Sequence, residues 1–256
     1  MSKEVLKSIW KQSVVSFLIY RSTSIITIVL ATVFLVIELL VGKIYFSYGS
    51  VNGWTSNDYY ILITFMNSAT NLYNLFFIIE HENLAEDILE GELDYIFVRP
   101  VSSYWYAVMG ELDLPSVFNL LLSGGLMAHY LMEGQIAGWN CFLIVVMVFL
   151  TAALIFLLNQ IVISLNFWFD GLSALAGIVE DVVGWASRPR QIFPKVIQQL
   201  FLFVVPVLMA SNLPEEVVIR QRNYWMLGYY VLFLAGLYLF SKWVWKKGTK
   251  RYSSAN

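Results

Sequence analysis

The chain has 256 residues, of which 59% are hydrophobic, 16% aromatic and only 13% charged, and its net charge is -2. Because a soluble domain usually carries roughly 25% charged residues, this composition excludes a soluble globular protein and indicates an integral membrane protein. The charge balance offers no basic surface for nucleic acid, and the single cysteine, Cys141, excludes an internal disulfide framework.

The N-terminal 22 residues predict a helix on the inner membrane surface. Lys3, Lys7 and Lys11 alternate with apolar residues at helical spacing, while Trp10 and Tyr20 suit the depth of the lipid headgroups. We therefore expect residues 1–22 to form an interfacial elbow before the first membrane span.

Six apolar runs are long enough to cross a bilayer, which takes about 20 apolar residues per helix. They predict an all-α integral membrane protein, one membrane domain over residues 1–256, with transmembrane helices at 23–44, 59–80, 114–132, 139–165, 195–213 and 223–245.

Two of these predicted spans contain polar residues that need a partner. Glu38 lies about one turn from the outer end of the first span, where snorkelling or a bond to Lys43 is favoured over contact with a substrate. In the second span, side chains spaced four, three, four and three residues apart share one helix face: Tyr60, Thr64, Asn67, Asn71 and Asn74. This stripe either hydrogen-bonds a neighbouring helix or lines a pathway or subunit interface. Candidate partners are Asn159, Gln160, Ser164, Gln198 and Gln199.

The loop between spans two and three, residues 81–112, holds the main concentration of charge. Seven of the eighteen acids lie between positions 80 and 94, around its first part: Glu80, Glu82, Glu86, Asp87, Glu90, Glu92 and Asp94. Asn83 with Glu86 suits a capping box and Gly91 suits a left-handed stop, which predicts a short helix of about two turns. Arg99 precedes Pro100 and predicts an extended segment before a second interfacial helix near Tyr104. The loop is either an ordinary solvated connection or a docking element.

A shorter apolar run, Leu172 to Ser187, keeps Glu180 and Asp181 off its apolar stripe, which favours a helix lying in the interface. We accordingly predict a cytoplasmic interfacial segment over residues 167–194. With six spans and the N-terminus inside, thirteen of the sixteen basic residues lie on the inner side, Arg188 and Arg190 among them. If the run spanned the membrane as a seventh helix, this bias would be lost. Both termini are therefore predicted to be cytoplasmic.

Two segments resemble permeases of type-2 ABC exporters, a bacterial six-span family. "GELDYIFVRPVSSYW", Gly91 to Trp105, is similar to the family's segment between spans two and three, with its Gly-Glu-Leu-Asp, its Arg-Pro or Lys-Pro and its Val-Ser. "RPRQIFPKVIQQLFLFVVPVLMASNLPEE", from Arg188, resembles the fifth span, with Pro194, Pro206 and an outer Asn-Leu-Pro. With the six-span plan, the resemblance covers nearly the whole chain.

The resemblance implies a permease subunit in the bacterial cytoplasmic membrane that pairs with a second, identical or paralogous, permease. Cytoplasmic ATP-binding subunits would grip the loop between spans two and three as a coupling helix and would hold ATP and Mg²⁺, so no cofactor is expected in this chain. The implied coupling residues are Asn83, Leu84, Glu86, Asp87, Ile88, Leu89, Glu90 and Gly91, with Arg99 and Pro100 in the supporting turn. The implied substrate pathway comprises Thr64, Asn67, Asn71 and Asn74 with Gln198 of span five.

Other function classes find less support in the residues. The Gly-Lys pair at Gly42 lacks the earlier glycine of a phosphate-binding loop, since Ile37 stands in that position. A membrane-embedded enzyme would need a nucleophile, base or metal cluster, and no such cluster is visible. An ion-coupled secondary transporter would normally need paired carboxylates or broken helices near the membrane midplane.

Overall fold

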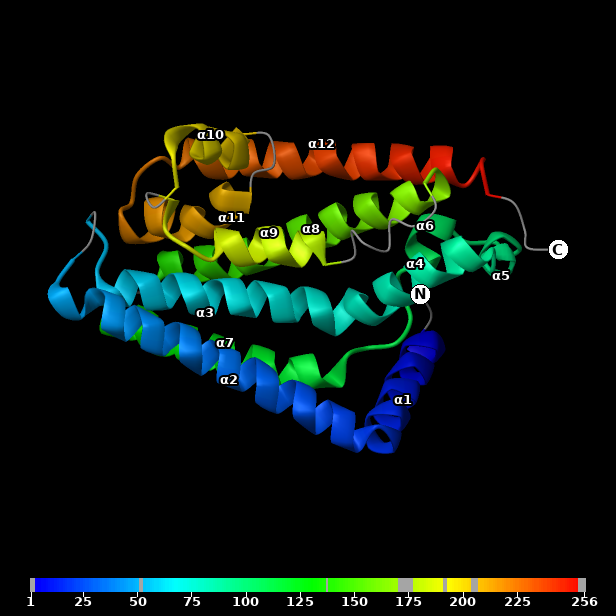
Figure 1. Cartoon of the computed structure of the whole chain (residues 1–256), viewed down its shortest axis with the longest axis horizontal. Helices are drawn as coiled ribbons and strands as arrows, with labels where there is room; N and C mark the ends of the chain where they lie inside the picture. Colours follow the sequence, from blue (N-terminus) through cyan, green and yellow to red (C-terminus); the bar gives the residue numbers. More distant parts are fainter. Residues whose placement is uncertain are drawn as a thin grey trace.

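The computed structural model describes residues 3–50, 53–136, 138–169, 177–190, 193–203 and 207–252. In these ranges the regular elements are helices and no strand is formed. The helices form an elongated bundle (Figure 1). We call the end where α4 stops the Gly91 end and the opposite end, where α3 starts, the Thr55 end. The helix α1 and the close of α12 both lie at the Gly91 end (Figure 1).

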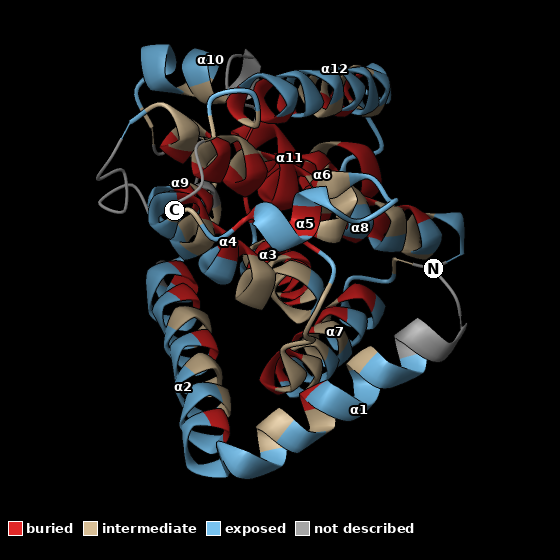
Figure 2. Ribbon diagram, turned by 90° about the vertical axis from the view of Figure 1, so that its right-hand side faces the viewer, coloured by how far each residue is buried: buried red, intermediate tan, exposed pale blue. Residues whose placement is uncertain are grey.

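A separate helix precedes the first apolar one. α1 (Lys3–Ile19) turns at Tyr20 into α2 (Arg21–Tyr45), and the two helices meet at an angle (Figure 1). Most of α2 is exposed, which suits a helix that faces lipid on several sides (Figure 2). Its close approach to α3 is at Gly42, where an added Cβ would lie 2.5 Å from the Tyr59 ring. That α1 lies on a membrane surface stays a prediction.

The second predicted span is longer than expected. α3 (Ser56–Tyr73), the π-helical segment η2 (Asn74–Ile78) and α4 (Ile79–Glu90) follow one another without a break. Thr55 begins the helix with a capping box to Asp58, and Gly91 ends it in the left-handed conformation with φ of 75°. The Gly91 stop is thus confirmed.

The predicted short helix with Asn83 as its cap is wrong. Asn83 lies in the middle of α4, because no proline or glycine interrupts residues 74 to 90 and the helix simply continues. The predicted loop, residues 81–112, begins at His81, yet His81 is 2% exposed and packs inside the bundle.

The loop beyond Gly91 contains two single-turn helices. α5 (Asp94–Phe97) replaces the extended segment predicted there, and the chain leaves helical geometry only near Arg99 and Pro100. The predicted second interfacial helix is reduced to α6 (Ser103–Tyr106). Tyr104 and Val108 are buried, so this part of the loop packs against the bundle.

Three further long helices begin and end within a turn of the predicted ranges. They are α7 (Leu114–Glu133), α8 (Trp139–Ser164), which continues as η3 (Leu165–Phe167), and α12 (Trp225–Gly248). By length and composition, four of the described helices could cross a membrane: Arg21–Tyr45, Ser56–Glu90, Trp139–Phe167 and Trp225–Gly248. The chain is therefore a multi-pass membrane protein, and the count of six spans stays a prediction.

The predicted fifth span is divided in the structure. α10 (Lys195–Phe203) and α11 (Val207–Leu213) are separate helices, and η6 (Pro214–Ile219) extends α11. Pro206, the predicted interruption, lies outside the described residues. All of α11 is buried in the middle of the bundle (Figure 2). α10 and α11 lie in the half of the bundle toward the Thr55 end (Figure 1).

The segment before α10 differs from the sequence prediction. Within 167–194 the structure describes 167–169, 177–190 and 193–194, and α9 (Ile178–Ala186) contacts α8 and α11 rather than standing apart from them. Val179 and Val183 supply its buried face. Arg190 then lies at the Thr55 end, where its guanidinium pairs with Glu216.

Arg190 thus lies with Glu216 and Asn212, at the opposite end of the bundle from the turn at Gly91, whereas the sequence prediction placed it on the same side as Arg99. The sequence pattern of α9 is amphipathic, and amphipathicity does not distinguish a helix on a membrane surface from one packed on other helices. Moving Arg188 and Arg190 to the other side weakens the bias of basic residues toward the Gly91 end without reversing it.

The corrected placement can be tested by labelling intact cells. In a Cys141→Ser background, we expect Arg188→Cys to react with a membrane-impermeant maleimide added outside, and Glu86→Cys to react only after lysis. Both positions are exposed in the structure, so access to each depends on the side of the membrane. Protection of Arg188→Cys in intact cells, followed by labelling after lysis, would return this segment to the cytoplasmic side.

Candidate functional site

A cavity of about 270 Å³ lies between α2, α3, α8 and α9 at the level of the apolar helices. Its apolar wall is formed by Phe34, Ile155 and Val183, and its polar wall by Glu38, Asn67, Thr70, Tyr73, Asn74, Glu180 and Ser187. The cavity is therefore amphipathic and includes two members of the predicted stripe, Asn67 and Asn74.

Glu38 is held at this cavity by Asn67. The Asn67 side-chain amide donates to Glu38 Oε2 at 2.9 Å and also to the Ile63 carbonyl of its own helix at 3.0 Å. The predicted partner Lys43 is wrong, because positions five apart on a helix point about 140° away from each other. Glu38 thus joins α2 to α3 and faces the cavity instead of reaching for the surface.

The rest of the predicted stripe has a structural role. Asn71 is buried and donates to the Asn67 carbonyl at 2.8 Å, while the Thr64 hydroxyl donates to the Tyr60 carbonyl at 2.7 Å. Neither Thr64 nor Asn71 lines the cavity. Both therefore satisfy their polar groups within α3.

The candidate partners on other helices do not bond the stripe. Gln198 lies in α10 and donates to the Phe193 carbonyl at 2.8 Å, away from the cavity. The Asn159 amide donates to Glu180 at 3.3 Å, and Gln160 takes His81 as its partner. Helical periodicity places residues on a face, but it does not say which neighbouring helix covers that face.

A chain of buried hydrogen bonds spans the π-helical segment next to the cavity. The Tyr73 hydroxyl lies 2.8 Å from His81 Nδ1, and His81 Nε2 lies 2.9 Å from Gln160 Oε1. One extra residue in a π turn lets positions eight apart share a face, as positions seven apart do in an α-helix. The π geometry therefore aligns Tyr73 with His81 and braces the helix against α8.

The predicted coupling residues are divided between the two faces of α4 and the turn after it. Leu84 and Ile88 are buried in the bundle, whereas Asn83, Glu86 and Glu90 are exposed and Leu89 is 41% exposed.

The turn itself is fixed by local contacts. The Gly91 and Glu92 N–H groups both donate to the Asp87 carbonyl, and the Asp87 carboxylate accepts a 2.9 Å bond from the Tyr95 hydroxyl. Burial is the leading cause that raises the pKa of Tyr95, followed by its bond to Asp87, so the phenol stays protonated and donates. Arg99 lies over the Tyr106 ring at 5.6 Å, and Pro100 is exposed.

The far part of the loop is attached to α8 and α12. Trp105 stacks on Phe156 of α8 with ring centroids 5.7 Å apart and an interplanar angle of 5°. The Trp245 indole donates to the Ser103 hydroxyl at 3.1 Å, and the Tyr104 and Ser241 hydroxyls lie 2.9 Å apart. A displacement of this loop must therefore move the end of α12.

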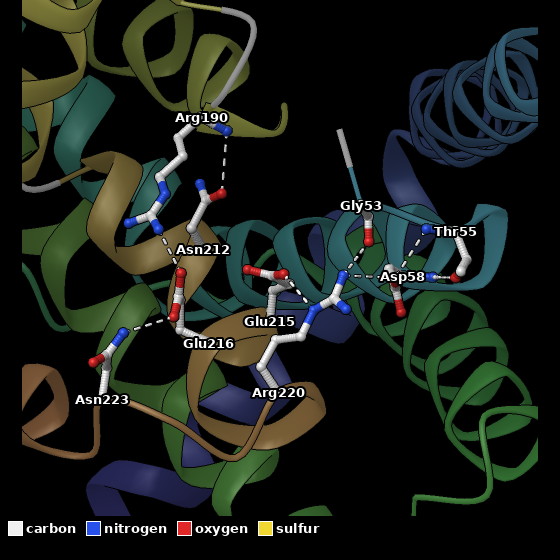
Figure 3. A network of polar contacts seen from close by, with 9 residues as sticks. All are labelled: Gly53, Thr55, Asp58, Arg190, Asn212, Glu215, Glu216, Arg220 and Asn223. Atoms are coloured by element: carbon white, nitrogen blue, oxygen red, sulfur yellow. Dashed lines mark hydrogen bonds and ion pairs between the residues drawn. The ribbon is translucent and has the colours of Figure 1, made fainter. Parts of the chain in front are cut away.

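The Thr55 end is closed by a network of ion pairs and hydrogen bonds (Figure 3). Arg220 pairs with Glu215 at 2.8 Å and with Asp58 at 3.5 Å, and it donates to the Gly53 carbonyl. The Arg190 backbone N–H donates to Asn212 at 3.1 Å, while its guanidinium pairs with Glu216. Glu216 also accepts from Asn223 at 2.8 Å. These contacts join α3, the segment after α9, and α11 with η6. Sequence reasoning missed the network because its members are far apart in the chain.

Among the described residues, no group of His, Cys, Asp and Glu side chains is arranged to hold a metal ion.

The sequence profile of a family described as ABC-2 family transporter protein matches residues 26–256. No protein of curated function and no solved structure matches the chain.

The bond between Glu38 and Asn67 predicts an asymmetric mutational effect. We expect Asn67→Leu to lower the free energy of unfolding by about 1–2 kcal/mol, because the Glu38 carboxylate then lies beside the cavity without its donor. The double variant Glu38→Leu/Asn67→Leu should recover much of the loss. Thermal unfolding in detergent measures both effects, and additive losses in the double variant would contradict the pairing.

The left-handed turn at Gly91 predicts a difference between two small substitutions. Gly91→Ala places a Cβ in a conformation that costs an L-residue about 1–2 kcal/mol, whereas asparagine tolerates this conformation. We expect Gly91→Ala to lower the unfolding midpoint more than Gly91→Asn does. Equal midpoints would show that the left-handed conformation does not limit stability.

Proposed function

Because the chain belongs to the ABC-2 family of transporters, as the membrane component rather than an enzyme, we propose that it is the permease subunit of an ATP-driven exporter. It pairs with a second permease, identical or paralogous, and each permease binds a cytoplasmic ATP-binding subunit at the Gly91 end. ATP and Mg²⁺ bind in that separate subunit. The protein lies in the bacterial cytoplasmic membrane with the Gly91 end inside and the Thr55 end outside.

The docking surface on this proposal is the exposed part of α4 and the loop after it. Its acids Glu86 and Glu90 flank Leu89, and Val98 beyond the turn is 80% exposed. A complementary subunit therefore presents an apolar groove with a basic rim. Leu89 and Val98 would bury apolar surface against this subunit. The acids Glu86 and Glu90 would favour association with a partner of complementary charge.

The observation that carries this proposal is the unbroken helix from Ser56 to Glu90, 35 residues long. Glu86 lies near its end and Asn67 lies on the cavity, which places them about 30 Å apart along one helix at 1.5 Å per residue. A hydrogen-bonded helix transmits displacement along its axis with little loss. Movement of the docked subunit thus reaches the cavity directly through the same element.

The cavity is the proposed part of the substrate pathway, with Asn67, Thr70 and Asn74 along one side. Apolar walls opposite a polar wall of amides, hydroxyls and the carboxylates Glu38 and Glu180 suit an amphipathic cargo, such as a lipid-like molecule or a peptide. The predicted pathway residues Thr64, Asn71 and Gln198 do not line this cavity, so their part in transport would be structural support.

A second candidate function rests on one feature of the cavity. Glu38 and Glu180 both line it, and a pair of carboxylates at membrane depth is what an ion-coupled secondary transporter needs. The family match over residues 26–256 favours the ATP-driven mechanism. Transport by the reconstituted complex that requires ATP and persists without an ion gradient would separate the two.

The docking proposal predicts the effect of reversing charge on the exposed face of α4. We expect Glu86→Lys/Glu90→Lys to weaken binding of the copurifying ATP-binding subunit by more than tenfold, because two attractive charge contacts become repulsive. Glu133→Lys, at an exposed acid toward the Thr55 end of α7, is the matched control.

Binding is measured with purified permease in lipid nanodiscs at two salt concentrations. The loss should shrink at high salt, since surface charge is screened. Unchanged binding in the α4 variant, with normal membrane insertion, would remove this face from the interface.

A further inference from the structure

The residues after α12 return to the turn that follows α4. α12 ends at Gly248, the Arg251 N–H donates to the Gly248 carbonyl at 2.8 Å, and the next residue, Tyr252, contacts residues near 91. Tyr252 is half-buried, whereas Lys250 and Arg251 immediately before it are exposed. The chain thus brings one aromatic side chain across the base of the loop.

The Tyr252 hydroxyl makes two hydrogen bonds to the backbone of this turn. It donates to the Gly91 carbonyl and accepts from the Leu93 N–H at 2.9 Å. Its ring also meets the Phe97 ring edge-on, with centroids 5.3 Å apart. Leu93 is fully buried, so its N–H takes the phenol oxygen as acceptor where water has little access.

The two hydrogen bonds of Tyr252 hold the turn between α4 and α5, and the proposed docking surface lies on both sides of this turn. Gly91 is the point where the chain leaves α4, and Leu93 is the residue from which α5 starts. A single oxygen that binds both fixes the angle between α4 and α5. That angle sets where Val98 stands relative to Glu86 and Glu90.

We propose that Tyr252 is a positioning residue for the ATP-binding subunit: its hydroxyl, bridging Gly91 and Leu93, holds the turn in the shape that the subunit docks on and links that turn to α12. This inference rests on the proposed docking function. It adds a residue 161 positions along the chain from Gly91 that does not itself lie on the exposed face of α4.

The link to α12 gives the contact a second consequence. Ser103 and Tyr104, at the other end of the loop, bond Trp245 and Ser241 of the same helix. The loop is therefore attached to α12 at both of its ends, while α4 attaches it to α3. Movement of the docked subunit therefore reaches α12 through Tyr252 at the turn as well as through Ser103 and Tyr104.

The test compares Tyr252→Phe, which keeps the ring contact with Phe97 and removes both hydrogen bonds, with Tyr224→Phe. Tyr224 is an exposed tyrosine at the start of α12, on the far end of the bundle. Each permease is assembled in lipid nanodiscs with the ATP-binding subunit that copurifies with the wild type. Three quantities are measured: the Kd for that subunit, the kcat and KM for ATP of the complex, and amide exchange of residues 92–97.

For Tyr252→Phe we expect faster exchange in residues 92–97 and about tenfold weaker binding, because the subunit must first order the turn. We also expect a several-fold smaller effect of the permease on kcat, with KM for ATP unchanged, since ATP binds in the partner. Merely structural damage would lower the unfolding midpoint and speed exchange throughout α12. Tyr224→Phe should match the wild type.

One outcome would overturn the role of Tyr252 alone, and another would overturn the proposed function as well. Wild-type binding with an unchanged Kd and kcat in Tyr252→Phe would overturn the role of Tyr252 and leave the proposed function standing. A wild-type permease that binds no ATP-binding subunit would overturn the proposed function and this inference with it.

Discussion

The unbroken helix from Ser56 to Glu90 is the constraint on which the rest of the structure depends. In a bilayer every backbone polar group must be paired within the protein, and a continuous helix does this for its whole length. α2, α7, α8 and α11 all contact α3 along this helix. The cavity forms beside its middle, and the loop of exposed acids forms at its end. The cavity and the loop are therefore connected through one continuous helix.

The π-helical segment from Asn74 to Ile78 is the place where this element departs from ideal geometry. Such segments pair residues five positions apart instead of four and recur at functional sites. Here the departure is supported by Tyr73, His81 and Gln160, which join the two sides of the segment to α8. These hydrogen bonds therefore stabilise the helix across the π-helical segment, although the geometry of this segment differs from that of the α-helical turns on either side.

The two ends of the bundle are held by different chemistry. At the Thr55 end, charged pairs such as Arg220 with Glu215 and Arg190 with Glu216 join segments remote in sequence (Figure 3). At the Gly91 end, aromatic stacking and hydroxyl contacts from Trp105 and Tyr104 hold the loop to α8 and α12. The Glu215 and Glu216 side chains are only 7% and 12% exposed, so these charge pairs lie mostly out of water.

The sequence by itself determined the membrane class, the bounds of α2, α7, α8 and α12 to within a turn, and the stop at Gly91, because apolar length and glycine conformation are local properties. The sequence also predicted that a stripe of polar residues in the second span, Tyr60, Thr64, Asn67, Asn71 and Asn74, shares one helix face. The tertiary structure alone decided that Asn67 and Asn74 reach a cavity while Asn71 does not, that Glu38 takes Asn67 rather than Lys43, and that Arg190 lies with Glu216. It also decided that α4 continues α3 and that Tyr252 reaches Gly91. Each of these depends on which helices are neighbours, and periodicity along one helix carries no information about the helix beside it.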